Sequence, residues 1–147
     1  MQLINSKIVP SNQNIFWENL PESWHSLTQR KCIILTLPYR PGSPEHETLL
    51  KMLAACKLVP EQYHILTLTE GEQIAWHQLK STLKPEYVLL LGINPQMIGI
   101  SALFRINEPN SFNGCTIIPS LSLDQLIQMQ DMRTALWVNG LKPVFVP

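Results

Sequence analysis

EYVLLLGINP, residues 86–95, is the stretch that decides the fold. Its run from Val88 to Leu91 is wholly apolar, too short for a helix and bounded by a proline before it and a Gly-x-x-Pro breaker after it. These features predict a strand that is buried on both faces, as in a parallel sheet. Because Gly92 can take a positive φ and Pro95 ends strand pairing, we expect the strand to stop abruptly in a loop that carries Asn94.

The same alternation of apolar runs and helical patterns extends over most of the chain. Right-handed crossovers between such units give a parallel sheet with helices on its faces. The sequence therefore predicts an α/β fold, a three-layer sandwich with a four-stranded parallel sheet. The predicted strands cover residues 32–37, 63–68, 88–91 and 115–118, and the predicted helices cover residues 43–58, 71–84 and 122–137.

Local signals predict where several elements begin and end. Ser43-Pro44-Glu45 is typical of a helix start, with a capping serine, a proline in the first turn and an early acid. Asn139-Gly140 is typical of a helix end. We expect a short helix after Pro95, a loop over residues 107–114, and a short strand or tucked tail over residues 144–146.

Composition limits the classes of function. The chain has 147 residues and 45% hydrophobic content, which suits one domain with a real core. Lys+Arg and Asp+Glu number 11 each, so the net charge is zero, and no dense basic run occurs. A protein that grips a nucleic acid backbone normally carries a basic patch. We therefore expect any DNA contact to be weak or indirect.

Cysteine and histidine spacing gives no metal site. The three cysteines lie far apart in apolar runs, which is typical of buried small hydrophobes in a reducing compartment. The four histidines show no ligand spacing, so neither a metal nor a cofactor is predicted. Without a signal pattern or a membrane-length apolar run, the expected location is the cytoplasm. The cysteines are Cys32, Cys56 and Cys115.

Residues 1–30 form a predicted N-terminal arm before a single domain over residues 31–147. The arm combines loop-forming residues with three aromatic side chains, Phe16, Trp17 and Trp24. Two interpretations stand side by side. The arm packs on its own domain, or its aromatic residues anchor a partner protein, as aromatic residues do at interfaces.

The predicted strands end in loops of the types PYRPG, TEGE, GINP and PSLS, which converge on one edge of the sheet. Ligands bind at such edges in open parallel sheets. No catalytic constellation is complete there. Ser120 has no evident histidine partner and suits a turn or a cap, and Asn94 suits a turn. The candidate pocket residues are Pro38, Tyr39, Gly92, Asn94, Pro119 and Ser120.

The order of these loops resembles the uracil-DNA glycosylase superfamily, which has a parallel four-stranded sheet. That family carries a G-Q-D-P-Y loop after its first strand and an H-P-S-P-L loop at its last. Here the corresponding stretches are LTLPY, residues 35–39, and IPSLS, residues 118–122. The motif G-I-N-P of the mismatch-specific branch is similar to residues 92–95, although in that branch it follows the first strand.

Two departures from the glycosylase pattern concern catalysis. The family's water-activating aspartate falls at Leu37, and its charge-stabilising histidine falls at Ile118. An aliphatic side chain can act neither as a general base nor as an electrostatic stabiliser. The resemblance therefore implies the fold without glycosylase activity.

The C-terminal third resembles the psi subunits of bacterial DNA polymerase III. SLSLDQL at residues 120–126 and RTALW at residues 133–137 are similar to the psi pattern S-x-x-L-x-x-L followed by R-x-A-L-W. The resemblance implies a non-catalytic accessory protein of the replication machinery with a degenerate glycosylase-like fold. Its implied partners are clamp-loader subunits or subunits associated with single-strand-binding protein. Arg133 and Trp137 then join the arm aromatics as candidate partner-binding residues.

Three alternatives remain open at this point. The first is a diverged nucleobase glycosylase that holds a base with Asn94 and Ser120. The second is a small-molecule-binding domain that uses the same strand ends. In the third, the psi-like segment is an ordinary helix that covers the sheet. A deep polar pocket favours a ligand, whereas a mouth filled by Leu37, Tyr39 and Ile118 favours a scaffold.

Overall fold

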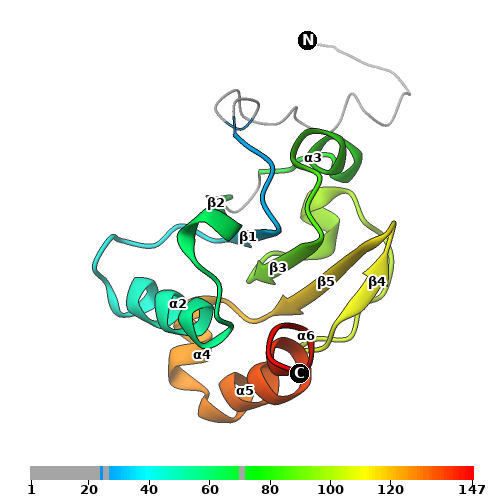
Figure 1. Ribbon diagram of the computed structural model, residues 1–147. Coiled ribbons are helices and arrows are strands. Elements are labelled where there is room, and N and C mark those ends of the chain that lie inside the picture. Colours follow the sequence, from blue (N-terminus) through cyan, green and yellow to red (C-terminus); the bar gives the residue numbers. More distant parts are fainter. Residues whose placement is uncertain (1–23, 25–26, 70–71) are drawn as a thin grey trace.

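A five-stranded mixed β-sheet lies at the centre of the computed structural model, which describes residue 24, residues 27–69 and residues 72–147 (Figure 1). The strands lie in the order β2-β1-β3-β5-β4. The pairs β1–β2, β1–β3 and β3–β5 are parallel, and β4 is antiparallel to β5. The strand bounds are β1 (Cys32–Thr36), β2 (Tyr63–Thr67), β3 (Tyr87–Leu91), β4 (Asn110–Phe112) and β5 (Cys115–Ser120).

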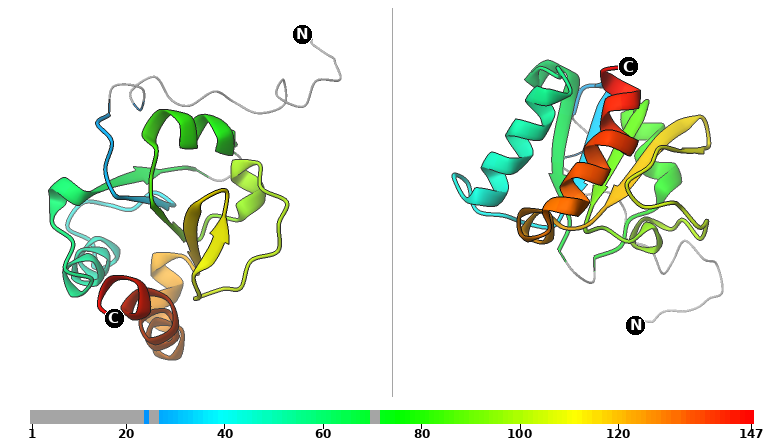
Figure 2. Two further views of the ribbon diagram at one scale, coloured as in Figure 1. Left: turned by 45° about the vertical axis from the view of Figure 1, so that its right-hand side comes forward. Right: turned by 90° about the horizontal axis from the view of Figure 1, so that it is seen from below.

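Helical segments pack against both faces of this sheet (Figure 2). On one face the core includes α3 (Trp76–Leu83) and the 3₁₀ turn η3 (Pro95–Ile98). On the other face it includes α2 (Pro44–Ala55) and α4 (Leu123–Gln128). That second face also carries α5 (Gln130–Ala135), the π-helical turn η4 (Leu136–Leu141) and α6 (Lys142–Phe145). These three segments follow one another directly, and we call residues 130–145 the C-terminal helix.

Strand β3 confirms the prediction made from residues 86–95. Val88 and Leu90 belong to the core on the α3 side, and Leu89 and Leu91 belong to the core on the α2 side. All four side chains are buried, so the strand is covered on both faces. This explains why its sequence is continuously apolar rather than alternating.

The helix predicted from residue 43 is confirmed as α2. The Ser43 hydroxyl accepts a hydrogen bond from the His46 backbone N–H at 3.2 Å, and Pro44 opens the first turn. Leu49 and Leu53 are the buried residues of this helix. A 3₁₀ turn, η2 (Pro60–Gln62), then leads into β2.

The expected loop over residues 107–114 is wrong in part, because it contains β4 and the turn that joins it to β5. Phe112 pairs with Cys115, and only Asn113 and Gly114 lie between them. Both have positive φ values, 51° and 78°. Such a two-residue turn matches the twist of a hairpin. The sheet therefore has five strands and not the four that were predicted.

The expected start of the second helix at residue 71 is also corrected. Residues 72–75 are not helical, and the Ile74 backbone N–H donates to the Met97 carbonyl at 3.0 Å. That bond ties the segment to η3. The helix then ends at Lys84, which takes a left-handed φ of 48° before β3 begins.

The prediction that Asn139-Gly140 ends the last helix is wrong. The helical backbone passes through Gly140 as η4 and continues in α6 to Phe145, so residues 144–146 are not a strand. A Cβ atom at Gly140 would lie 2.9 Å from the Asn107 carbonyl oxygen. Glycine at this position thus permits a close approach of helix and loop.

Candidate functional site

The predicted strand-end site is closed at its centre by the chain itself. Gly92 follows β3 with a φ of +73°, and a Cβ atom there would lie 2.8 Å from the Ser122 Cβ and 3.2 Å from the Leu37 Cδ1. Ser122 is the N-cap of α4 and is itself buried. The loops after β1, β3 and β5 therefore meet by direct packing.

Ser120 and Pro119 lie in β5, where both are buried. The Ser120 hydroxyl donates to the Asn107 side-chain oxygen at 2.6 Å. The Pro119 carbonyl accepts from the Asn107 backbone N–H at 2.7 Å. Both residues thus anchor the loop before β4, and the Ser120 hydroxyl is engaged within the chain.

Asn94 is exposed and caps η3. Its side-chain oxygen accepts a hydrogen bond from the Gln96 backbone N–H at 3.0 Å. This is the turn-stabilising arrangement that asparagine commonly adopts. Asn94 does not line the small hollow that is described next.

A small hollow remains at the strand ends, beside β1. Its volume is about 220 Å³, and Pro38 and Tyr39 are the predicted pocket residues that line it. Glu45 and Asp124 add two carboxylates, of which Asp124 accepts a hydrogen bond from the Ser122 hydroxyl at 2.6 Å. The structure thus brings only part of the predicted pocket together.

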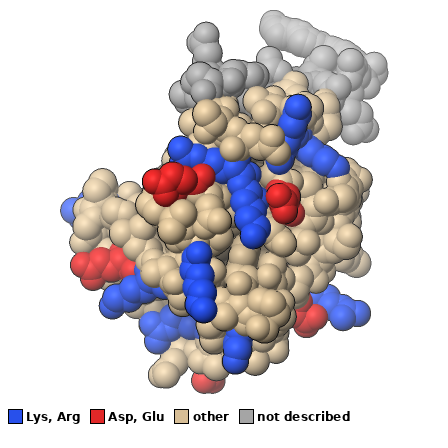
Figure 3. Space-filling model, viewed as in Figure 1, with Lys and Arg blue, Asp and Glu red and all other residues tan. Residues whose placement is uncertain are grey.

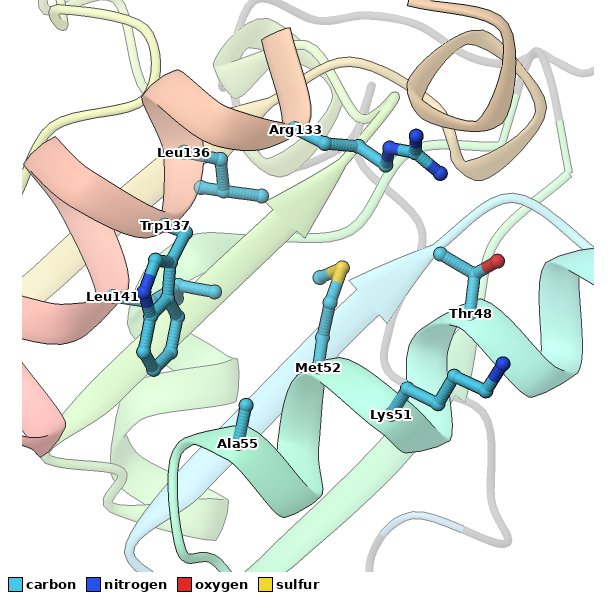
Figure 4. A pocket seen from close by; sticks show the side chains of 8 residues that line it. All are labelled: Thr48, Lys51, Met52, Ala55, Arg133, Leu136, Trp137 and Leu141. Atoms are coloured by element: carbon cyan, nitrogen blue, oxygen red, sulfur yellow. The ribbon is translucent and has the colours of Figure 1, made fainter. Parts of the chain in front are cut away.

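A larger apolar groove lies between α2 and the C-terminal helix, on the face of the sheet that these helices cover (Figure 4). These helices run side by side in Figure 2. The groove has a volume of about 310 Å³, near the lower end of the range of about 300–1,000 Å³ for ligand pockets. Its lining residues are Thr48, Lys51, Met52, Ala55, Arg133, Leu136, Trp137 and Leu141.

Three residues of the psi-like segment RTALW contribute to this groove, namely Arg133, Leu136 and Trp137. Leu136 is buried, whereas Arg133 and Trp137 are half-buried and keep part of their surface open. Figure 4 shows the Trp137 ring and the Met52 side chain in the gap between the two helices. The sequence-predicted residues Arg133 and Trp137 are thus brought together at one concave surface.

The charge of the groove is positive. Arg133 and Lys51 line it from the two helices, and no Asp or Glu does. Among the residues that the structure describes, the single ion pair is Arg105–Glu108. The Arg133 guanidinium and the Lys51 ammonium also make no side-chain hydrogen bond within that part of the chain. Both cations are therefore available to an anionic group.

Sequence analysis missed the wall of the groove that α2 provides. Leu49 and Leu53 have the spacing of a core-facing helix stripe, and Met52 and Ala55 continue it to one side. The apolar face of α2 is thus wider than core packing alone requires, and this width could have indicated the wall. Without the packing of the C-terminal helix, however, the sequence did not indicate which element lies opposite.

The residues of the N-terminal arm that were predicted to bind a partner do not all lie at a free surface. Trp24 is only 7% exposed and belongs to the core on the α3 side, so it does not present a free indole to a partner. Arg30 also binds the domain, since its guanidinium donates to the carbonyls of Pro60 and Tyr63. Phe16 and Trp17 lie outside the described residues.

Basic side chains are spread over the face shown in Figure 3, with acidic side chains between them. In the described ranges, no three His, Cys, Asp or Glu residues are grouped to hold a metal ion. Nor does any helix in those ranges have the length and apolar character to cross a membrane.

The chain matches no protein-family model and no curated protein.

Proposed function

We propose that this chain is a non-catalytic accessory protein of the DNA replication machinery, similar to the psi subunits of bacterial DNA polymerase III. In this proposal the domain is a degenerate, glycosylase-like three-layer sandwich that binds other proteins. Its interaction surface is the groove between α2 and the C-terminal helix.

One observation carries the proposal. The segment that resembles psi, residues 133–137, supplies one wall of the apolar groove between α2 and the C-terminal helix. Arg133 and Trp137 are residue types that are enriched at binding hot spots. Both side chains keep part of their surface open beside this apolar hollow.

The strand ends support the non-catalytic part of the proposal. Leu37 packs so close to Gly92 that a Cβ atom there would lie 3.2 Å from its Cδ1, and Ile118 is 1% exposed within the core on the α2 side. Ser120 is bound to Asn107, and Asn94 is bound to η3. The groups on which a diverged glycosylase would depend are thus engaged in structural contacts or are aliphatic.

Affinity purification from the native cell tests the proposal. We expect the tagged wild-type chain to retain clamp-loader subunits or proteins bound to single-strand-binding protein. Ala55→Arg places a long cation into the groove, whereas Ala54→Arg adds the same side chain at an exposed α2 position that does not line it. Retention by wild type and Ala54→Arg, with loss in Ala55→Arg, supports the groove as the contact.

The absence of replication proteins from the wild-type sample would contradict the proposed function. A Phe16→Ala/Trp17→Ala chain tests the arm separately. If replication proteins are lost in this chain and kept in Ala55→Arg, the arm is the contact and the groove is not.

A further inference from the structure

The groove between α2 and the C-terminal helix has a chemistry that defines the segment it would bind. We propose that it receives a partner segment in which a large apolar side chain is flanked by carboxylates. This inference rests on the proposed function, because it names the partner chemistry at the same site.

Apolar side chains form the walls of the groove. Leu136 and Leu141 are 1% and 2% exposed and form its inner surface. Trp137 provides a rigid aromatic wall, and Met52 faces it with a flexible thioether that adapts to the shape of its neighbour. A volume of about 310 Å³ accommodates one or two large side chains and not a second folded element.

Lys51 and Arg133 give the groove its positive charge. They come from opposite helices, Arg133 from the C-terminal helix and Lys51 from α2 (Figure 4). Glu47 precedes Lys51 by one helical turn, and Asp131 lies two residues before Arg133, yet neither acid pairs with these cations or lines the groove. No carboxylate of the described residues thus pairs with either cation, and both can meet an anionic group of a partner.

The carboxylates of a protein segment suit this mouth better than the phosphates of a nucleic acid backbone. The guanidinium of Arg133 can hold a carboxylate with two parallel hydrogen bonds. A nucleic acid backbone would place a regular row of phosphates on a wall that is mainly apolar, and two cations offer too few contacts for it. A protein segment provides apolar and acidic groups side by side, and these match the groove.

Peptide selection tests the inference. A random display library is selected on the folded wild-type chain and on Ala54→Arg, and binders to Ala55→Arg are removed. We expect the surviving sequences to share an aromatic or aliphatic residue with neighbouring Asp or Glu. Survivors with basic or uncharged flanks, or no survivors that depend on an open groove, would overturn the inference.

Affinities of the selected peptides give the second measurement. We expect Arg133→Glu to weaken fluorescence-anisotropy binding about tenfold or more, since it replaces an attraction by a repulsion. Lys142→Glu makes the same charge change on an exposed residue of the C-terminal helix outside the groove, and we expect binding within about twofold of wild type. Equal effects of the two substitutions would contradict the proposed role of Arg133. Circular dichroism establishes that both variants fold.

The two proposals fail in different ways. Acid-flanked apolar peptides with no replication protein in the affinity purification would leave the groove chemistry standing and overturn the replication function. Replication proteins retained by both wild type and Ala55→Arg, with no selected peptide that depends on an open groove, would do the reverse. A wild-type dimer that Ala55→Arg abolishes in analytical ultracentrifugation would assign the groove to a second copy and overturn the inference.

Discussion

At the scale of single residues, substitutions at Gly92 and Gly42 distinguish the cost of a left-handed backbone from the cost of a steric clash. Both have a positive φ, +73° and +79°, but only Gly92 is packed against Ser122 and Leu37; nothing lies within 4 Å of a Cβ at Gly42. We expect Gly42→Ala to lower the free energy of unfolding by about 1 kcal/mol, the cost of a left-handed alanine. Gly92→Ala should lower it by about 2–4 kcal/mol, because Ser122 must also move.

Urea denaturation of both variants measures this difference. The close approach at Gly92 joins the end of β3 to the start of α4, so a matched pair of glycine variants reports on the closure of the strand ends. Equal losses of stability in the two variants would mean that the packing against Ser122 adds nothing.

Cys32 predicts how stability changes with pH. Burial, together with the nearby Cys56 thiol, raises the pKa of the Cys32 thiol to about 12. The unfolded chain therefore loses this proton from about pH 9 upward while the folded chain keeps it, and stability falls as pH rises between these values. The loss for one such group is at most about 1.4 kcal/mol per pH unit.

Denaturation at pH 8 and pH 10 tests this expectation in wild type and Cys32→Ala. The variant cannot ionise at position 32, so we expect its stability to fall less between the two pH values. The other ionisable groups are common to both proteins, and the difference between the proteins removes their contribution. A fall of the same size in both would contradict the raised pKa.

At the scale of elements, helix propensity and packing have opposite effects on stability at Gly140 in the C-terminal helix. Alanine favours a helix over glycine by about 0.5–1 kcal/mol. A Cβ at position 140, however, would lie 2.9 Å from the Asn107 carbonyl oxygen and 3.2 Å from the Ile118 Cγ2. We expect Gly140→Ala to lower the free energy of unfolding by about 1–2 kcal/mol, since the contact outweighs the propensity.

Asn139→Ala provides the control for this substitution. It lies beside Gly140 in η4 but is exposed, so we expect it to be neutral or slightly stabilising. Thermal denaturation of both variants tests the expectation. If Gly140→Ala is more stable than wild type, the loop at Asn107 can shift without lowering the free energy of unfolding.

The same element shows why sequence alone did not locate the end of the helix. Asn139-Gly140 is a typical stop signal, yet the helix passes through it, and Gly140 there packs close to Asn107, which is distant in sequence. By contrast, the Asn113-Gly114 turn was a local signal that the prediction overlooked. The first error required tertiary information, whereas the second did not.

At the scale of the whole molecule, the alternation of β1, β2, β3 and β5 with helices was predictable, whereas β4 and the groove were not predicted. Continuous apolar runs and helix periodicity record burial against the sheet, and these determine the α/β architecture with its central β1 and β3. The groove depends on the distance between α2 and the C-terminal helix, which no local pattern records. Arg133 and Trp137 were named from a resemblance, while Lys51 and Met52 required the structure.

The whole molecule also predicts the outcome of a glycosylase assay. The general base and the charge-stabilising group of the resembled superfamily fall at Leu37 and Ile118, and Ile118 packs in the core beside Gly140. General-base catalysis contributes about 10²–10⁴-fold to a rate, and one charge-stabilising donor about 10²–10³-fold. We expect base release from uracil-containing and mismatched duplexes to be at least about 10⁴-fold slower than with an active uracil-DNA glycosylase.

That enzyme on the same duplexes is the positive control, and Asn94→Ala is the decisive variant. Asn94 is exposed and bonded to the Gln96 backbone, so its loss should alter only the local turn. Release of free base by the wild-type chain that disappears in Asn94→Ala would assign catalysis to the loop after β3. The strand ends would then be a site and not a packed junction, and the accessory role would have to be replaced by an enzymatic one.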